Sequence, residues 1–164
     1  MTRMLALFAL CGLPFAGKST LARALAAQTD ASLVVLDAIN HEHGLGLAGS
    51  TISADDWRRT YAEAYRRIAT HLAGGRSVVF DHANLTRAER DQVRAIGQRA
   101  GAHVQFLYVA VSEDVVRQRW RTNRQTGERY DVPDEMFELA MRAFQAPDGE
   151  LDVLKIETFT RASG

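Results

Sequence analysis

The clearest chemical signature in the sequence is a glycine-rich loop that carries a lysine and a serine. Residues Gly12 to Ser19 complete the pattern G-x-x-x-x-G-K-[ST]. Glycines let such a loop turn tightly, so that its N–H groups converge on phosphate oxygens. Lys18 can reach the β- and γ-phosphates of a nucleotide, and the Ser19 hydroxyl can ligate Mg²⁺. The pattern predicts ATP and Mg²⁺ as ligands. The predicted ATP contacts are Gly12, Leu13, Pro14, Phe15, Ala16, Gly17, Lys18, Ser19 and Thr20.

Two aspartates stand where strands are expected to end. Asp37 follows the apolar run 33–36, and Asp81 follows the run 77–80. Ligands of open α/β sheets bind beyond the carboxyl ends of the strands, so both carboxylates would face the nucleotide. Asp81 is placed as a Walker-B residue would be, and it is predicted to hold Mg²⁺ together with Ser19. Asp37 is predicted to accept the proton of an attacking hydroxyl. The alternative for each is a turn or cap residue, because aspartate is common at strand ends.

The segment 38–49 contains three glycines and several polar residues, and it is expected to form a mobile loop beside a substrate. Asn40 and His41 in this segment are predicted contacts of a phosphoryl acceptor, together with Asp37. Asn84, three residues after Asp81, is a further predicted acceptor contact.

Five arginines fall within thirteen residues and are opposed in that span only by Glu128. They are Arg117, Arg119, Arg121, Arg124 and Arg129. Arginines on a closing lid can stabilise the negative charge of phosphoryl transfer and exclude water, so residues 117–133 are predicted to form a lid. The alternative is a solvated helix face. Helical spacing does not allow all five to reach one phosphate, and two are expected to be functional.

Apolar runs of strand length alternate with amphipathic helical stretches, which predicts an α/β fold of three layers with a five-stranded, mostly parallel sheet. The expected strands are 4–11, 33–36, 77–80, 104–111 and 153–158. Ser53 and Thr86 each begin a capping-box pattern that predicts a helix start, and Gly101 is a predicted helix stop. The whole chain, 1–164, is expected to be one domain.

Composition narrows the classes of function. The 20 basic and 20 acidic residues give a formal net charge of zero, which argues against a broad nucleic-acid-binding surface. Cys11 is the only cysteine, so no intramolecular disulfide can form, and a reducing, cytoplasmic compartment is expected. The apolar run 4–11 leads directly into the glycine-rich loop and is interpreted as a strand. No later run is long enough to span a bilayer, so no membrane partner is expected.

The sequence resembles the P-loop kinases related to phage polynucleotide 5′-hydroxyl kinase and the zeta toxins. The resemblance covers nearly the whole chain. It rests on Gly12–Ser19, Asp37, the stretch Phe80–Arg87, the arginine segment and the run Val132–Glu135.

This resemblance implies a nucleoside-kinase-like fold and a set of roles. Asp37 would be the general base, Lys18 and Ser19 would hold ATP and Mg²⁺, and two lid arginines, assigned to Arg119 and Arg124, would contact the phosphates. The polynucleotide kinase also has an arginine shortly after its catalytic aspartate. Here Asn40 and His41 occupy that region, which favours a different acceptor.

The sequence therefore favours an ATP-dependent kinase that acts on a hydroxyl of a small molecule. A polynucleotide or RNA 5′-hydroxyl kinase is the second hypothesis, although a basic groove with interleaved aromatic residues is not evident. A nucleotide-binding regulatory ATPase without an acceptor is the third. The guanine-reading pattern Asn-Lys-x-Asp is absent, and the pattern leaves open whether the protein is a monomer or a homodimer.

Overall fold

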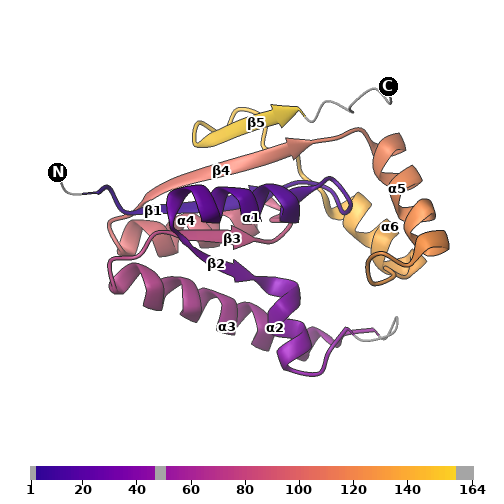
Figure 1. Ribbon diagram of the computed structural model, residues 1–164, viewed down its shortest axis with the longest axis horizontal. Helices are drawn as coiled ribbons and strands as arrows, with labels where there is room; N and C mark the ends of the chain where they lie inside the picture. Colours follow the sequence, from indigo (N-terminus) through magenta and orange to yellow (C-terminus); the bar gives the residue numbers. More distant parts are fainter. Residues whose placement is uncertain (1–2, 47–50, 158–164) are drawn as a thin grey trace.

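A parallel sheet forms the centre of the molecule, as seen in the computed structural model, which describes residues 3–46 and 51–157 (Figure 1). The order of its strands is β2-β3-β1-β4-β5, and every neighbouring pair is parallel. The strands are β1 (Ala6–Cys11), β2 (Ser32–Val35), β3 (Val78–Asp81), β4 (His103–Ala110) and β5 (Val153–Glu157). The predicted fold class is confirmed, and the sheet is wholly rather than mostly parallel.

Six helices surround the sheet in the described part of the chain. They are α1 (Lys18–Thr29), α2 (Leu36–Glu42), α3 (Ala54–Ala73), α4 (Arg87–Arg99), α5 (Glu113–Thr126) and α6 (Asp134–Ala143). None of these helices combines the length and apolarity that a membrane crossing requires.

Side chains of the central strands alternate between two hydrophobic cores, one on each face of the sheet. Leu7 and Phe80 belong to the core beneath α3 and α4. Leu10 and Val79 belong to the opposite core, which α1 covers and to which α5 and α6 contribute. Because strands buried on both faces need apolar residues at every position, their sequences read as continuous rather than alternating apolar runs.

The helix starts that were predicted from capping patterns are confirmed. The Ser53 hydroxyl accepts a hydrogen bond from the Asp56 amide at the start of α3. Thr86 and Glu89 form a complete reciprocal capping box at the start of α4. Both motifs are local, since a side chain three residues away satisfies a free N–H group.

The segment after β2 differs from the expected loop. Its first part is the helix α2, whose first turn carries Asp37. Leu36, predicted to end the strand, is 1% exposed and packs into the core beneath α3. Burial of Leu36 and Ile39 gives this short segment an apolar stripe at helical spacing, which explains the helix. Residues 47–49 of the expected loop, and residue 158 of the expected last strand, lie outside the described residues.

Helices α5 and α6 form a lobe at the carboxyl ends of the strands (Figure 1). The rings of Trp120 on α5 and Phe137 on α6 stack with centroids 4.1 Å apart. The Trp120 indole also donates to the Val132 carbonyl, 2.8 Å away, and so ties the connection between the two helices to α5. This lobe places the arginine segment above the glycine-rich loop.

Candidate functional site

The glycine-rich loop connects β1 to α1 and has the backbone conformation that close approach to phosphates requires. Gly12 has φ of 147°, and a Cβ atom there would lie 2.8 Å from the Val109 carbonyl oxygen. Phe15 and Gly17 also have positive φ, at 62° and 98°. Gly12 donates its N–H to the Ala83 carbonyl at 3.0 Å, which fixes the loop to the chain after β3. Only glycine is tolerated at position 12, where both the φ and the space exclude a side chain.

Lys18, at the start of α1, and Asp81, at the end of β3, line the same hollow. The Lys18 ammonium donates to the Leu13 carbonyl at 2.6 Å. Burial lowers the pKa of Lys18 to about 8, although the charge of Asp81 acts in the opposite direction. Burial likewise raises the pKa of Asp81, and a hydrogen bond from Ser19 and the charge of Lys18 partly offset this effect. Both shifts follow from the cost of holding a charge away from water. A bound anion would oppose the shift of Lys18, and a bound cation would oppose that of Asp81.

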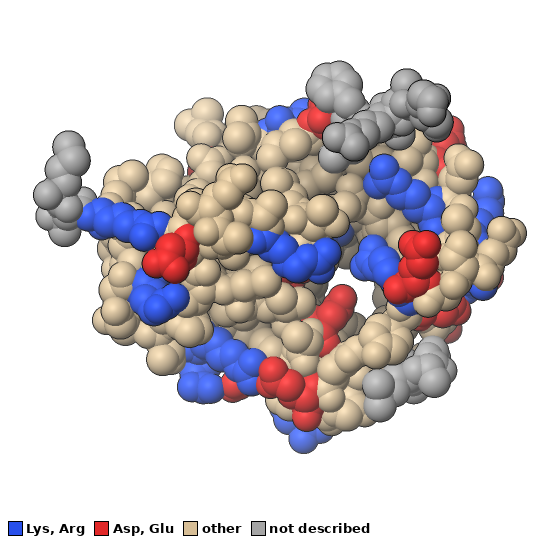
Figure 2. Space-filling model, in the orientation of Figure 1, with Lys and Arg blue, Asp and Glu red and all other residues tan. Residues whose placement is uncertain are grey.

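Three hollows meet at this loop. The small hollow, about 180 Å³, is lined by Lys18, Ser19, Asp37 and Asp81. The large hollow, about 670 Å³, extends from the same aspartates towards α2, α3 and the lobe. The third, here called the lobe hollow, is about 450 Å³ and lies between the loop and α5. Figure 2 shows the molecule hollowed between its body and the lobe, with basic and acidic side chains around the opening.

Asp37 lies where the small and large hollows share a wall. It is exposed, and α2 presents it from its first turn. The structure therefore places this carboxylate between the predicted phosphate contacts and a space large enough for a small molecule. Ser19 and Asp81 also line both hollows, so the two predicted Mg²⁺ ligands lie at the same junction.

Asn40 and His41 both line the large hollow, but they differ in how free their side chains are. Asn40 is 3% exposed, and its amide oxygen accepts a hydrogen bond of 2.7 Å from Thr60 on α3. Its amide oxygen therefore already serves to fix α2 on α3. His41 instead meets the ring of Tyr130 from the lobe edge-on, with centroids 4.5 Å apart. This contact joins α2 to the lobe at the lining of the large hollow.

Two arginines of the arginine segment lie against the glycine-rich loop. Arg119 donates to the Phe15 carbonyl at 3.0 Å and lines the lobe hollow. Arg129 lines all three hollows, and its guanidinium lies over the Phe15 ring, 4.8 Å from the centroid. Asn123 fixes this position, because it accepts from the Arg129 N–H at 2.8 Å and donates to the Arg129 carbonyl at 3.0 Å.

Arg124 requires a correction, since the structure places it away from the loop and from all three hollows. Its guanidinium pairs with Asp131 and Asp134 and lies over the Trp120 ring, 4.3 Å from the centroid. Arg129, rather than Arg124, accompanies Arg119. Helix α5 ends at Thr126, so the position of Arg129 depends on the turn that follows and not on helical spacing.

Asn84 also lies elsewhere than expected. Its side chain is fully buried, it lines none of the three hollows, and its amide donates to the Leu10 carbonyl at 2.7 Å. Its φ of 44° turns the chain after β3 back towards β1. In this position the side chain is structural and cannot reach an acceptor in the large hollow.

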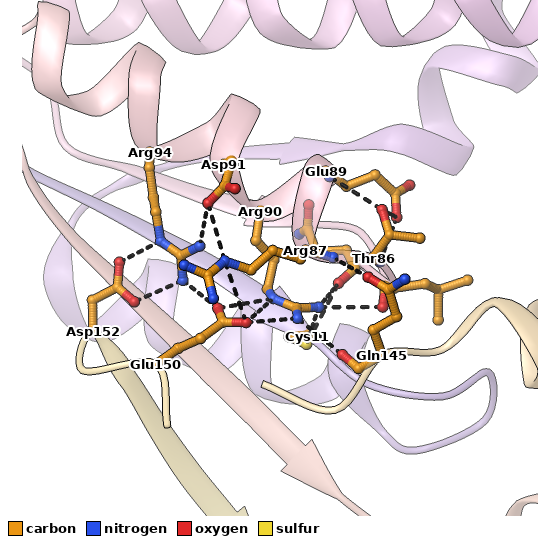
Figure 3. Close-up of polar contacts among 12 residues, drawn as sticks. Cys11, Thr86, Arg87, Glu89, Arg90, Asp91, Arg94, Gln145, Glu150 and Asp152 are labelled. Carbon is orange, nitrogen blue, oxygen red and sulfur yellow. Dashed lines mark hydrogen bonds and ion pairs between the residues drawn. The ribbon is translucent and has the colours of Figure 1, made fainter. Parts of the chain in front are cut away.

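A buried ion-pair cluster contacts the turn at Asn84 through hydrogen bonds from Arg90 (Figure 3). Sequence reasoning did not identify this cluster. Arg90 on α4, whose side chain is 1% exposed, donates to the Asn84 and Leu85 carbonyls. It also pairs with Glu150, and Glu150 pairs in turn with Arg94. The cluster thus connects α4 and the chain before β5 to the turn that contacts Gly12. No local pattern signals it, because the pairs are about 60 residues apart.

His82, which follows Asp81 and lines the small hollow, is held by a second polar cluster. Its Nε2 lies 2.9 Å from the Tyr61 hydroxyl and 3.3 Å from a Glu89 carboxylate oxygen. Burial would raise the pKa of Glu89, but hydrogen bonds, first among them that to His82, lower it to about 2. Glu89 therefore stays ionised and both caps α4 and orients the chain beside Asp81.

The residues present are suited to a magnesium nucleotide. The loop N–H groups and Lys18 are suited to phosphate oxygens, and Ser19 and Asp81 offer two oxygen ligands at the same place. Within residues 3–46 and 51–157, no group of three or more His, Cys, Asp or Glu side chains forms a metal cage. A Mg²⁺ ion here would thus depend on these two side chains and on the phosphates, which is usual for this ion.

Solved structures share this fold. A candidate kinase from Chloroflexus aurantiacus j-10-fl has 23% identity and a TM-score of 0.77, with 95% of this chain and 89% of that chain covered. A gluconokinase from Sinorhizobium meliloti 1021 has 20% identity and a TM-score of 0.66, over 94% and 83%. Kti12 from Chaetomium thermophilum, solved with ADP-AlF3, has 17% identity and a TM-score of 0.72, over 92% and 88%. No curated protein matches the sequence.

The family comparison covers most of the chain. A family model described as an AAA domain matches residues 7–147, which include the glycine-rich loop, both strand-end aspartates and the arginine segment. With the P-loop geometry and the parallel sheet described above, this match identifies the chain as a member of that AAA domain family, with the fold of the P-loop kinases.

Proposed function

We propose that this protein transfers the γ-phosphoryl group of ATP to a hydroxyl group of a small-molecule acceptor. One observation carries the proposal: Asp37 stands in the shared wall of the small hollow, which contains Lys18 and Ser19, and of a large hollow of about 670 Å³. A carboxylate in that position can serve as a general base for a hydroxyl that attacks a phosphate held by the loop.

Each residue of the site has a task that follows from its position. Lys18 and the loop N–H groups would bind the β- and γ-phosphates. Asp37 would accept the proton as the hydroxyl oxygen forms its bond to the γ-phosphorus and ADP departs. Ser19 and Asp81 would hold Mg²⁺, which would supply positive charge next to the phosphates.

Two arginines of the lobe would stabilise the negative charge of the transferring phosphoryl group from the side of the lobe. Arg129 lines all three hollows, so it is the residue best placed to contact the transferring group. Arg119 would fix the loop through the Phe15 carbonyl and face the nucleotide in the lobe hollow. The Tyr130–His41 contact would close the large hollow and limit the access of water.

Two further considerations favour a small acceptor over a nucleic acid. Tyr130 and His41 contact each other in the lining of the large hollow, and that lining combines apolar and acidic residues rather than a basic track. The gluconokinase among the similar structures supports the same class of acceptor.

The test is ATP consumption in the presence of Mg²⁺ with pools of small hydroxyl compounds and, separately, 5′-hydroxyl oligonucleotides. Asp37→Asn should retain ATP binding and lose transfer, with kcat lower by about 10²- to 10⁴-fold. Asp114→Asn is the matched control, because Asp114 is also an exposed aspartate in the first turn of a helix but lines none of the hollows.

Full activity of Asp37→Asn would remove Asp37 as the base. Stimulation only by oligonucleotides would assign the protein to nucleic-acid processing. ATP binding without stimulation by either pool would favour the regulatory ATPase.

A further inference from the structure

The large hollow contains a cation that the proposed chemistry does not use. Arg23 projects from α1, is exposed, and lines the large hollow but not the small one. It forms no hydrogen bond or ion pair with any residue in the described parts of the chain. Most other arginines on the helices are paired, as Arg67 is with Glu42 and Arg117 with Glu138.

Arg23 lies one helical turn beyond the predicted Mg²⁺ ligand Ser19. Residues four apart on a helix share a face, with Cβ atoms separated by about 5–6 Å. Both residues line the large hollow, which confirms that they share this face. An acceptor whose reacting hydroxyl lies beside Asp37 would therefore extend along α1 towards the Arg23 guanidinium.

The other charges of the large hollow decide which ligand suits this guanidinium. Asp37 and Asp81 belong to the proposed reaction, and Asp131 is already paired with Arg124. Glu128 adds a fourth carboxylate to the lining. Apart from Arg129, which Asn123 fixes beside the loop, Arg23 is the one arginine or lysine of this lining in the described part of the chain.

One guanidinium among several carboxylates is suited to a monoanion. The Arg23 guanidinium can bind a carboxylate through two parallel N–H···O bonds. A phosphate monoester carries nearly two charges and would need a second cation, which the lining beside Arg23 does not offer in the described part of the chain. The apolar side chains of Leu33 and Val35 line the same hollow and can contact the carbon chain of such a ligand.

From this geometry we infer that the acceptor is a small polyhydroxy monocarboxylate, whose carboxylate pairs with Arg23 while a distant hydroxyl lies at Asp37. The inference rests on the proposed kinase function and adds the class of its acceptor. The separation along α1 favours chains in which several carbons stand between the carboxylate and the reacting hydroxyl.

The experiment compares two pools with the same carbon skeletons. One contains aldonic acids of four to six carbons, and the other contains the corresponding alditols. ATP turnover is measured with the wild type, with Arg23→Gln and with Arg121→Gln. Arg121 is an exposed arginine that lines none of the hollows and serves as the control. Calorimetry of acid binding, with a non-hydrolysable ATP analogue present, gives a readout that does not depend on turnover.

The acid pool should stimulate turnover far more than the alditol pool. Arg23→Gln should raise KM for the active acid about 10- to 100-fold and weaken its binding equally, while kcat changes little. Arg23→Lys should recover part of the loss, because lysine keeps the charge without the bidentate geometry.

The outcomes separate the two proposals. If alditols stimulate turnover as much as the acids or more, the kinase function stands, but the proposed recognition of an acceptor carboxylate is refuted. An unchanged KM in Arg23→Gln would also refute the role of Arg23. If sugar phosphates are better acceptors than the acids, the acceptor is a dianion and the inference is overturned. If neither pool nor any other hydroxyl compound stimulates turnover, the kinase function falls and this inference falls with it.

Discussion

The buried pair between Arg90 and Glu150 allows a quantitative test of how the site is supported. We consider Glu150→Gln, which removes one charge and keeps the shape of the side chain. Glu150 accepts hydrogen bonds from the Arg90 Nε at 3.1 and 3.2 Å and from Nη2 at 2.8 Å, and it also pairs with Arg94. The Arg90 and Glu150 side chains are only 1% and 4% exposed, so water cannot solvate the Arg90 guanidinium once its partner has lost its charge.

Two independent routes give the same magnitude. Burial alone would raise the pKa of Glu150, but the hydrogen bonds from Arg90 and Arg94 lower it from 4.5 to about 2. That difference corresponds to about 3 kcal/mol of stability at neutral pH. Removal of one partner from a buried ion pair typically costs about 3–5 kcal/mol. We therefore expect Glu150→Gln to lower the free energy of unfolding by about 3 kcal/mol at pH 7.

The pH dependence has a definite sign. Because the folded-state pKa lies below the unfolded value, the contribution is complete above pH 4.5 and decreases as the pH falls towards 2. Urea unfolding at pH 7 and pH 3 measures it, and the gap between wild type and variant should shrink by roughly half at pH 3. Glu138→Gln, which breaks the more exposed pair with Arg117, is the control and should unfold close to the wild type. If Glu150→Gln unfolds at the same urea concentration as this control, the pair does not support the fold as argued.

Three further predictions concern the loop, the lobe and the packing of α4. Because the pKa of Lys18 is about 8 and a bound triphosphate would raise it, ATP binding at pH 8 should take up about half a proton and should weaken as the pH rises further. Calorimetry in buffers of different ionisation heat measures this uptake, and equal apparent heats in all buffers would contradict it. Arg129→Ala should lower kcat by about 10³-fold or more, whereas Arg124→Ala should stay near the wild type in steady-state assays; equal losses would show that the two positions are misassigned. Gly97→Ala would place a Cβ atom 2.2 Å from the Val104 Cγ2, so it should lower stability by about 1–3 kcal/mol in thermal unfolding, and Val104→Ala should restore part of it. An unchanged Tm for Gly97→Ala would show that α4 can shift away from Val104 without loss of stability.

The features that sequence reasoning predicted correctly are those that short stretches of chain specify. The strands are continuous apolar runs because both faces of the parallel sheet are covered. The starts of α3 and α4 follow from Ser53 and Thr86, whose side chains bond to N–H groups three residues away. The glycine-rich loop is likewise a local pattern, and its positive φ angles at Gly12 and Gly17 are conformations that glycine adopts at low cost.

The features that were not predicted depend on residues far apart in the sequence. The helix α2 arose where a loop was expected, because its few apolar residues are stabilised only by packing against α3. Asn84 was predicted to contact an acceptor, but its side-chain amide donates to the Leu10 carbonyl, 74 residues away in the sequence. Arg90 and Glu150 are separated by 60 residues, so neither carries a signal of its partner.

The arginine segment shows why a sequence motif can leave open which arginine lies at the site. Helical spacing could compare Arg117, Arg119, Arg121 and Arg124 with one another, but it could not place a residue beyond the helix end. Gly127 ends α5 in a left-handed conformation, and the turn that follows is fixed by both hydrogen bonds of Asn123. Arg129 reaches the three hollows because of that turn. Arg124 lines none of them, and it pairs with Asp131 in the connection and with Asp134 in the first turn of α6. The different positions of Arg124 and Arg129 therefore depend on Asn123, Asp131 and Asp134, and none of these residue types indicates a phosphate contact in the sequence.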